Sequence, residues 1–133
     1  MALTIKTNLR NEYLYALIEG EFEYLSSIET TDAILEACAR HQATKVLVDY
    51  RTVAGAMNDN ERIHYAQISV EKYQKLFAKG VVKKCRFVWL GKQPLVDPKR
   101  LGESVALNMG LTIRVTQSLD DAFIWLGVQP DFD

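Results

Sequence analysis

The sequence predicts an α/β fold with the element order β-β-α-β-α-β-α-β-α. Two strand-like segments open the chain, and after them helical and strand-like segments alternate strictly. Such alternation is typical of a parallel sheet whose strands are joined by right-handed crossovers. The 133 residues are 48% hydrophobic and 25% charged, which suits one globular domain with its own core. We therefore expect a single domain over residues 1–127 and a short tail over residues 128–133.

The N-terminal third predicts a hairpin followed by a helix. Residues 3–5 alternate like a strand, residues 10–12 form a turn, and the more apolar residues 13–18 form a second strand. A helix is expected over residues 26–41, because apolar side chains recur there at helical spacing. Cys38 belongs to the inward stripe of this helix and is expected in the core.

The middle of the chain predicts two buried strands with a long helix between them. The continuous apolar run of residues 45–50 is typical of a strand covered on both faces. The polar residues 58–60 indicate a helix cap, and the helix that follows extends to Ala78 before Gly80 ends it. Residues 85–90 form the fourth strand.

The C-terminal third predicts two shorter helices that flank the last strand. Asp97 is expected to cap the first helix, with Pro98 in its first turn and Gly110 just past its end. The fifth strand occupies residues 111–115. A capped final helix occupies residues 118–126.

Composition and charge exclude several classes of function. The net charge of −1 leaves no excess of Lys and Arg to neutralise phosphates, so no nucleic-acid partner is expected.

No signal segment and no membrane-spanning apolar run is visible, which favours the cytoplasm. Cys38 and Cys85 are expected as packed, reduced thiols. Neither His41 nor His64 pairs with a cysteine at ligand spacing, so we expect no metal and no other cofactor.

Three stretches carry a family resemblance: residues 45–51 followed by Val53, residues 91–98, and residues 118–126. Together with the element order, they resemble the STAS domain, the fold of bacterial anti-anti-sigma factors, and more closely the bacterial SpoIIAA-like proteins. The likeness extends over residues 13–126. It implies a five-stranded mixed sheet, with four parallel strands and an antiparallel N-terminal strand, and a protein-interaction module.

The resemblance also directs attention to one turn. In the signalling members, a partner kinase phosphorylates a serine where the helix after the third strand begins. The corresponding residues 57–61 contain no hydroxyl group, and the carboxylates of Asp59 and Glu61 would repel a phosphate there. Thr52, the nearest hydroxyl, lies earlier in the loop and is a weak substitute. We therefore expect a binding module without the kinase-controlled switch.

A polar group lies near the expected carboxyl ends of the strands. Its members are Asp49, Arg51, Asn58, Asp59 and Arg62. Ligands of open parallel sheets bind beyond these ends, so the group predicts a recognition surface or a small anion site. In the structural alternative, the two carboxylates and the amide satisfy loop and helix N–H groups while Arg51 pairs with a carboxylate. Capping is the ordinary use of such residues, which favours this alternative.

The long helix ending at Ala78 predicts two further surfaces. Its inward stripe is Ile63, Ala66, Val70, Tyr73 and Phe77, of which Ile63, Val70, Tyr73 and Phe77 could line a pocket. Its opposite side and flank mix lysines with apolar residues, namely Tyr65, Ile68, Lys72, Lys75, Leu76 and Lys79. Such a face suits an anionic membrane or an acidic partner. Alternatively it is a solvated face whose C-terminal lysines complement the helix dipole.

Two binding functions follow, and no catalytic residue is assigned. The chain has no nucleophile in an elbow-like turn and no carboxylate pair in a recognisable motif, so we do not expect an enzyme. The first function is an interaction module for a protein partner. The alternative is a carrier of a small lipophilic ligand that contacts membranes transiently through the long helix. An open sheet edge or the outer helix face would also permit a homodimer.

Overall fold

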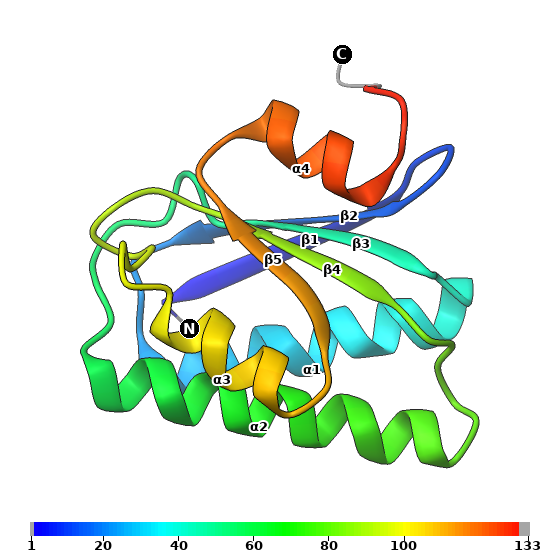
Figure 1. Ribbon diagram of the computed structural model, residues 1–133, viewed down its shortest axis with the longest axis horizontal. Coiled ribbons are helices and arrows are strands. Elements are labelled where there is room, and N and C mark those ends of the chain that lie inside the picture. Colours follow the sequence, from blue (N-terminus) through cyan, green and yellow to red (C-terminus); the bar gives the residue numbers. More distant parts are fainter. Residues whose placement is uncertain (1, 131–133) are drawn as a thin grey trace.

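The computed structural model describes residues 2–130 and confirms the predicted element order and mixed sheet (Figure 1). The strands are β1 (Leu3–Leu9), β2 (Leu14–Gly20), β3 (Lys45–Asp49), β4 (Arg86–Leu90) and β5 (Thr112–Thr116). The helices are α1 (Tyr24–His41), α2 (Asp59–Ala78), α3 (Leu101–Asn108) and α4 (Leu119–Leu126). The sheet order is β1-β2-β3-β4-β5, with β1 antiparallel to β2 and the other neighbours parallel.

The helices divide unequally between the two faces of the sheet. Helices α1, α2 and α3 lie on one face, and α4 alone lies on the other (Figure 1). Successive side chains of a strand point to opposite faces, so β3 supplies both cores. Val46 and Val48 join the larger core with α1, whereas Leu47 joins the core formed with α4.

The opening hairpin is longer than predicted. Strand β1 extends to Leu9 because it pairs with β2 along its whole length, from Leu3 opposite Gly20 to Leu9 opposite Leu14. Helix α1 also begins two residues early, since the Glu23 side chain accepts a hydrogen bond from the backbone N–H of Ser26. The side-chain cap therefore fixes the first turn of this helix.

Helix α2 begins at the predicted cap but extends beyond the sheet. Asn58 and Glu61 form a capping box, in which each side chain accepts the backbone N–H of the other residue at 2.8 and 2.9 Å. The 20 residues of α2 span about 30 Å, whereas a five-residue strand such as β4 spans about 17 Å. The last turns of α2 therefore lie past the strands. Phe77 is 48% exposed there, so its predicted inward position is wrong.

The predicted start of α3 is also wrong. The Asp97 carboxylate accepts the backbone N–H groups of Lys99 and Leu101, which closes a turn before the helix. Arg100 then adopts a left-handed conformation with φ 57°, and regular helix begins only at Leu101. Pro98 therefore belongs to this turn and not to the first turn of α3.

Several further expectations concern single residues. Cys38 and Cys85 are buried free thiols, and hydrogen bonding to Cys85 together with burial raises the pKa of Cys38.

Val128 packs into the α4 core, and the backbone N–H of Gln129 donates to Glu12, so the expected tail is tied down at its start. The rest of that tail, residues 131–133, lies outside the described residues. No group of His, Cys, Asp and Glu within residues 2–130 has the arrangement of a metal site.

Candidate functional site

The five polar residues predicted to lie together near the carboxyl ends of the strands are divided between the two faces of the sheet. Asp49 points to the α4 side, where its carboxylate accepts the Tyr15 hydroxyl at 2.7 Å. Arg51 donates to the same carboxylate from its backbone N–H at 3.0 Å, from Nε at 3.1 Å and from a terminal nitrogen at 2.9 Å. Asp49 is only 2% exposed. The two residues form a closed ion pair with Tyr15 rather than an open anion site.

The protonation states of this cluster follow from its geometry. Burial by itself would raise the pKa of Asp49, but the hydrogen bonds from Arg51 and Tyr15 outweigh burial and lower that pKa. Burial and the bond to Asp49 raise the pKa of Tyr15 to about 12. At neutral pH the carboxylate is therefore ionised and the phenol keeps its proton. This arrangement fits the alternative in which Asp49 and Arg51 stabilise the fold and do not bind a ligand.

The other three residues of the group lie on the opposite side of the sheet. Asn58 caps α2, as described above. Asp59 and Arg62 form an exposed ion pair at 3.4 Å. Arg62 also donates to the backbone carbonyl of Pro94 at 2.8 Å, which ties α2 to the loop before α3. Each of these side chains thus has a structural partner, and their role in binding stays a prediction.

The mixed face predicted for α2 is not one continuous surface. Tyr65 and Leu76, predicted on the flank of the helix, are partly buried and pack against the larger core. Lys72 forms an ion pair with Asp32 of α1 at 2.9 Å. The remaining members are the partly buried Ile68 and the exposed Lys75 and Lys79.

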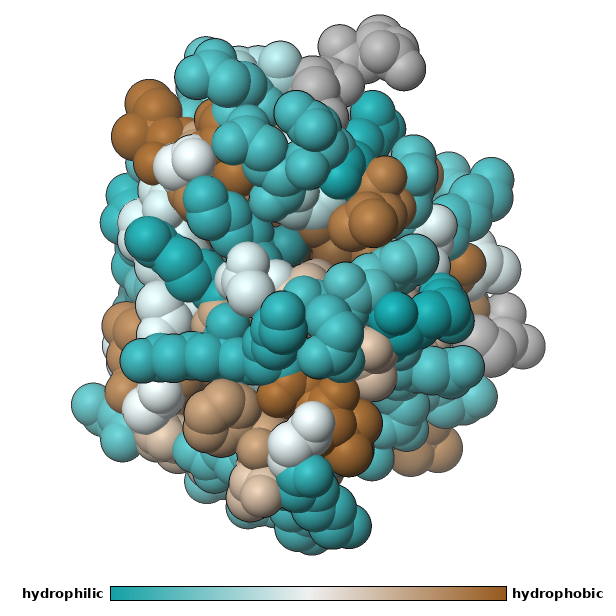
Figure 2. Space-filling view, turned by 90° about the vertical axis from the view of Figure 1, so that its right-hand side faces the viewer, coloured by the Kyte–Doolittle hydropathy of each residue, from teal (hydrophilic) through white to brown (hydrophobic). Residues whose placement is uncertain are grey.

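Figure 2 shows the end of the molecule where α2 finishes. Hydrophilic residues there divide the apolar surface into small patches. Such scattered apolar groups are ordinary on a protein surface. No helix among residues 2–130 is long and apolar enough to cross a membrane.

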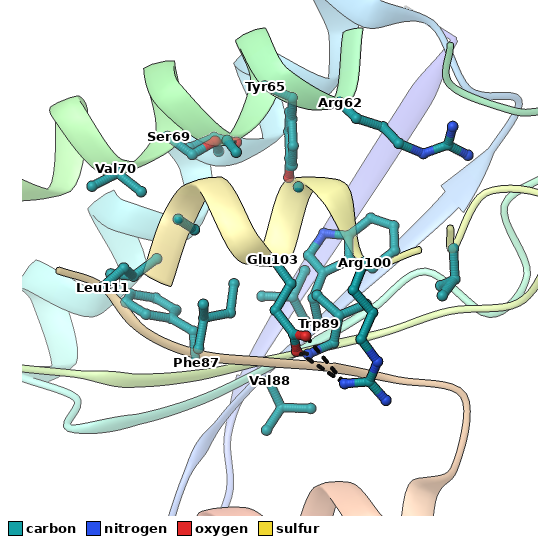
Figure 3. Close-up of a pocket in the computed structure, with 18 of the residues that line it drawn as sticks. Arg62, Tyr65, Ser69, Val70, Phe87, Val88, Trp89, Arg100, Glu103 and Leu111 are labelled. Carbon is teal, nitrogen blue, oxygen red and sulfur yellow. Dashed lines mark hydrogen bonds and ion pairs between the residues drawn. The ribbon is translucent and has the colours of Figure 1, made fainter. Parts of the chain in front are cut away.

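An apolar cavity of about 130 Å³ lies between α2, α3 and the sheet (Figure 3). Of the four predicted pocket residues, Val70 and Tyr73 line it, whereas Ile63 and Phe77 do not. In Figure 3, Tyr65 extends from α2 toward Trp89.

Small residues on α3 help to create this space. Gly102 and Ala106 both line the cavity, and Ala106 packs with Ala66 and Val70 in a small cluster between α2 and α3. A Cβ atom at Gly102 would meet the backbone oxygen of Arg62 at 3.6 Å, an ordinary contact. Helices α2 and α3 thus pack closely together, and the small side chains of Gly102 and Ala106 leave part of the space between α3 and β4 unfilled.

Two residues of the cavity lining, Arg62 and Trp89, carry a buried N–H donor that lacks a partner among the described residues. Trp89 lies on β4, beneath the two helices. Its side chain stacks on Tyr50, with ring centroids 4.3 Å apart, and the residue is 8% exposed. The indole Nε1 is buried and has no hydrogen-bond partner among the described residues. At the rim, Arg100 donates to the Glu103 carboxylate at 3.1 Å, as the dashed lines of Figure 3 show.

Sequence reasoning missed Trp89 and the α3 residues. The apolar run of residues 85–90 predicts burial but does not say which side chain borders empty space. A partial signal exists in Gly91. A Cβ atom there would come within 2.9 Å of the Trp89 ring, so the glycine makes room for the indole.

Several solved structures have a fold similar to that of this chain. An anti-sigma factor antagonist from Mycobacterium paratuberculosis has a TM-score of 0.62 and 17% identity over 94% of both chains. An uncharacterised DUF3478 protein with a SpoIIAA-like fold, from Shewanella loihica PV-4, has a TM-score of 0.53 and 18% identity over 94% of both chains. The unphosphorylated anti-sigma factor antagonist SpoIIAA has a TM-score of 0.57 and 10% identity, over 96% of this chain and 100% of its own.

The chain has a SpoIIAA-like fold. The predicted resemblance is confirmed at the level of architecture. No family model matches the sequence, and no curated protein matches it either. At 10–18% identity these similarities establish the SpoIIAA-like fold alone, and function has to be argued from this chain's own residues.

Proposed function

We propose that the chain is a non-catalytic interaction module that binds a partner protein through the loop between β3 and α2. The observation that supports this best is the shared SpoIIAA-like fold, because two of the similar structures are named as antagonists of another protein, an anti-sigma factor. The proposal places the module in the cytoplasm.

The loop between β3 and α2 is well suited to contact another protein. The backbone of Ala54 donates to Gly20 at 3.0 Å and accepts from Phe22 at 2.8 Å, so the loop is held against the end of β2. Its central residues, Ala54, Gly55 and Ala56, are exposed and small. A partner would therefore meet a fixed backbone at little cost in side-chain entropy.

The charges around the loop favour a basic partner. Glu21 is exposed beside Ala54, and Glu61 lies in the first turn of α2, where Arg62 offsets the charge of Asp59. The charge of Arg51 is taken up by Asp49, so it does not offset these carboxylates. Complementary positive charge on the partner would speed association and fix orientation.

The same segment argues against phosphorylation as the control. Residues 57–61 contain no hydroxyl group, and the side chain of Asn58 is already used to cap α2. We therefore propose a module whose binding is not switched by a kinase at this turn.

The test is affinity capture from a lysate of the source organism, with two matched variants. Ala56→Arg adds bulk and positive charge at an exposed loop position, and Asn8→Arg makes the same kind of change at an exposed position of β1. The proposal expects a protein that the wild type and Asn8→Arg retain and Ala56→Arg loses, with unchanged melting temperatures. Equal capture by all three proteins would contradict binding through this loop.

A second candidate function, carriage of a small lipophilic ligand, is favoured by the apolar cavity beneath α2 and α3. Its membrane component has less support, because Tyr65 and Leu76 pack inward. Native mass spectrometry of freshly purified protein would reveal a co-purified ligand. Absence of any adduct, together with no binding to anionic liposomes, would count against this candidate.

A further inference from the structure

The cavity contains a hydrogen-bond donor that the protein itself leaves unused. Trp89 is more than nine-tenths buried, its Nε1 lacks a partner among the described residues, and its side chain lines the cavity. Buried N–H groups are nearly always paired, because an unpaired donor forgoes its hydrogen bonds to water. An unpaired donor beside a cavity therefore points to an acceptor atom supplied from outside the chain.

The size and lining of the cavity limit what can bring that acceptor. A volume of about 130 Å³ is close to that of an engineered apolar cavity of about 150 Å³ that binds benzene. Most of the lining is aliphatic or aromatic, with Val70, Phe87, Ala106 and Ile113 among its members. A single ring matches this volume.

The charged groups of the lining are already paired within the protein. Arg100 pairs with Glu103, Arg62 pairs with Asp59, and the Asp97 carboxylate accepts two backbone N–H groups. The Nε of Arg62 is a second buried donor of the lining without a partner among the described residues, but Asp59 offsets the charge of the guanidinium. An ionised ligand would have to give up water without gaining a free counter-charge, which is costly. The ligand is therefore expected to be neutral.

We infer that the cavity binds a compact, neutral, cyclic molecule whose single hydrogen-bond acceptor, such as a ketone oxygen, takes the Trp89 Nε1 proton. This inference rests on the second candidate function and specifies its ligand class. It does not depend on the protein partner proposed for the loop.

The indole N–H signal provides a direct test with a matched pair of probes. Cyclohexanone carries the acceptor, and methylenecyclohexane replaces its oxygen with CH₂ at nearly the same shape. The chain has two tryptophans, so the Trp125→Phe variant has a single indole N–H signal, that of Trp89. Trp125 lies on α4 at the opposite face, where it stacks on Arg86, so its replacement leaves the cavity lining unchanged.

In ¹H–¹⁵N spectra of this variant, cyclohexanone should shift the Trp89 indole signal downfield in a saturable way. Methylenecyclohexane should bind without that downfield shift. Equal behaviour of the two probes would overturn the acceptor assignment while leaving an apolar carrier intact. No saturable change with either probe would overturn the inference and the second candidate function together.

A second variant measures the hydrogen bond as a ratio of affinities. Trp89→Phe keeps an aromatic ring but removes the N–H donor. The affinities for cyclohexanone and methylenecyclohexane are measured for both Trp89→Phe and Trp125→Phe. The affinity for cyclohexanone relative to methylenecyclohexane should fall about tenfold in Trp89→Phe and stay unchanged in Trp125→Phe. An unchanged ratio in Trp89→Phe would overturn the inference. If Trp89→Phe fails to fold, the indole measurement on Trp125→Phe still decides the matter.

Discussion

Each face of the sheet has a buried polar side chain next to the strands, and the two differ in whether the protein supplies a hydrogen-bond partner. On the α4 face, the Asp49 carboxylate receives hydrogen bonds from Tyr15 and Arg51, so that buried charge is paired. On the α2–α3 face, Trp89 lines an apolar cavity, and its Nε1 is not paired with any described residue. The first pattern stabilises a fold, and the second is the basis of the ligand site that we propose.

This contrast changes which residues deserve attention. A conspicuous carboxylate and guanidinium at the end of a strand invite a functional interpretation, yet here they neutralise each other within the protein. The ligand site that we propose lies instead among apolar side chains that look like ordinary core in the sequence. Unsatisfied groups are thus better guides to this site than charged ones.

The largest expected effect comes from breaking the paired face. Asp49→Ala leaves the Tyr15 hydroxyl and Arg51 without their shared acceptor, and should lower the free energy of unfolding by about 3 kcal/mol. Urea denaturation measures the change. Asp59→Ala, which removes a carboxylate from an exposed pair, is the control and should cost less than about 1 kcal/mol. Similar costs for the two variants would mean that Asp49 is not a structural centre.

The same cluster predicts a pH dependence of stability. The pKa of Asp49 is lowered in the folded protein, so its contribution is fully present above the ordinary carboxyl pKa of about 3.9. That contribution is lost as pH falls through the lower folded value. The stability difference between wild type and Asp49→Asn should therefore be constant at pH 5–7 and shrink below about pH 4. A difference that grows on acidification would contradict the ion pair.

A smaller effect is expected at the start of α2, which forms one wall of the cavity. Asn58→Ala removes the side-chain half of the capping box and should destabilise the protein by about 1 kcal/mol. Thermal unfolding followed by circular dichroism measures it. Asn58→Asp keeps an acceptor at the same position and should restore most of the loss. Failure of that rescue would indicate a role for Asn58 other than capping.

The smallest effect is expected at the far end of the same helix. Phe77→Ala changes a half-exposed ring beyond the sheet and should cost less than about 1 kcal/mol. Val70→Ala enlarges the cavity from a fully buried position on the same helix and should cost about 2 kcal/mol, although it removes a smaller side chain. Calorimetry of both variants tests this order, and the reverse order would place Phe77 in the core.

Local patterns were sufficient to predict most of the fold. Alternating and helical periodicities locate the strands and helices. The polar residues 58–60 and 118–121 predict the starts of α2 and α4, where Asn58 and Ser118 are the caps because their side chains accept helix N–H groups. The Asp97 cap was mispredicted because a carboxylate before Pro98 serves a turn as readily as a helix. The position of Phe77 depends on the relative lengths of α2 and the strands, which no local pattern contains.

The candidate site was less predictable for a physical reason. Val70 and Tyr73 were assigned to a pocket by helical spacing, and they do line it. Trp89 could not be identified, because an unpaired donor is defined by atoms that are missing around it and not by its own residue type. The separation of Asp49 from Arg62 likewise depends on which face each side chain takes once the sheet has formed.

The most direct test of the contrast between the two faces is a map of amide chemical shifts in the wild-type protein titrated with cyclohexanone. Saturable shifts should concentrate on Ser69, Val70 and Ala106, which line the cavity, and on Trp89 beneath them. Tyr15, Asp49 and Arg51 should stay unchanged. Shifts that concentrate around Asp49 and Arg51, with the cavity residues unaffected, would contradict the account.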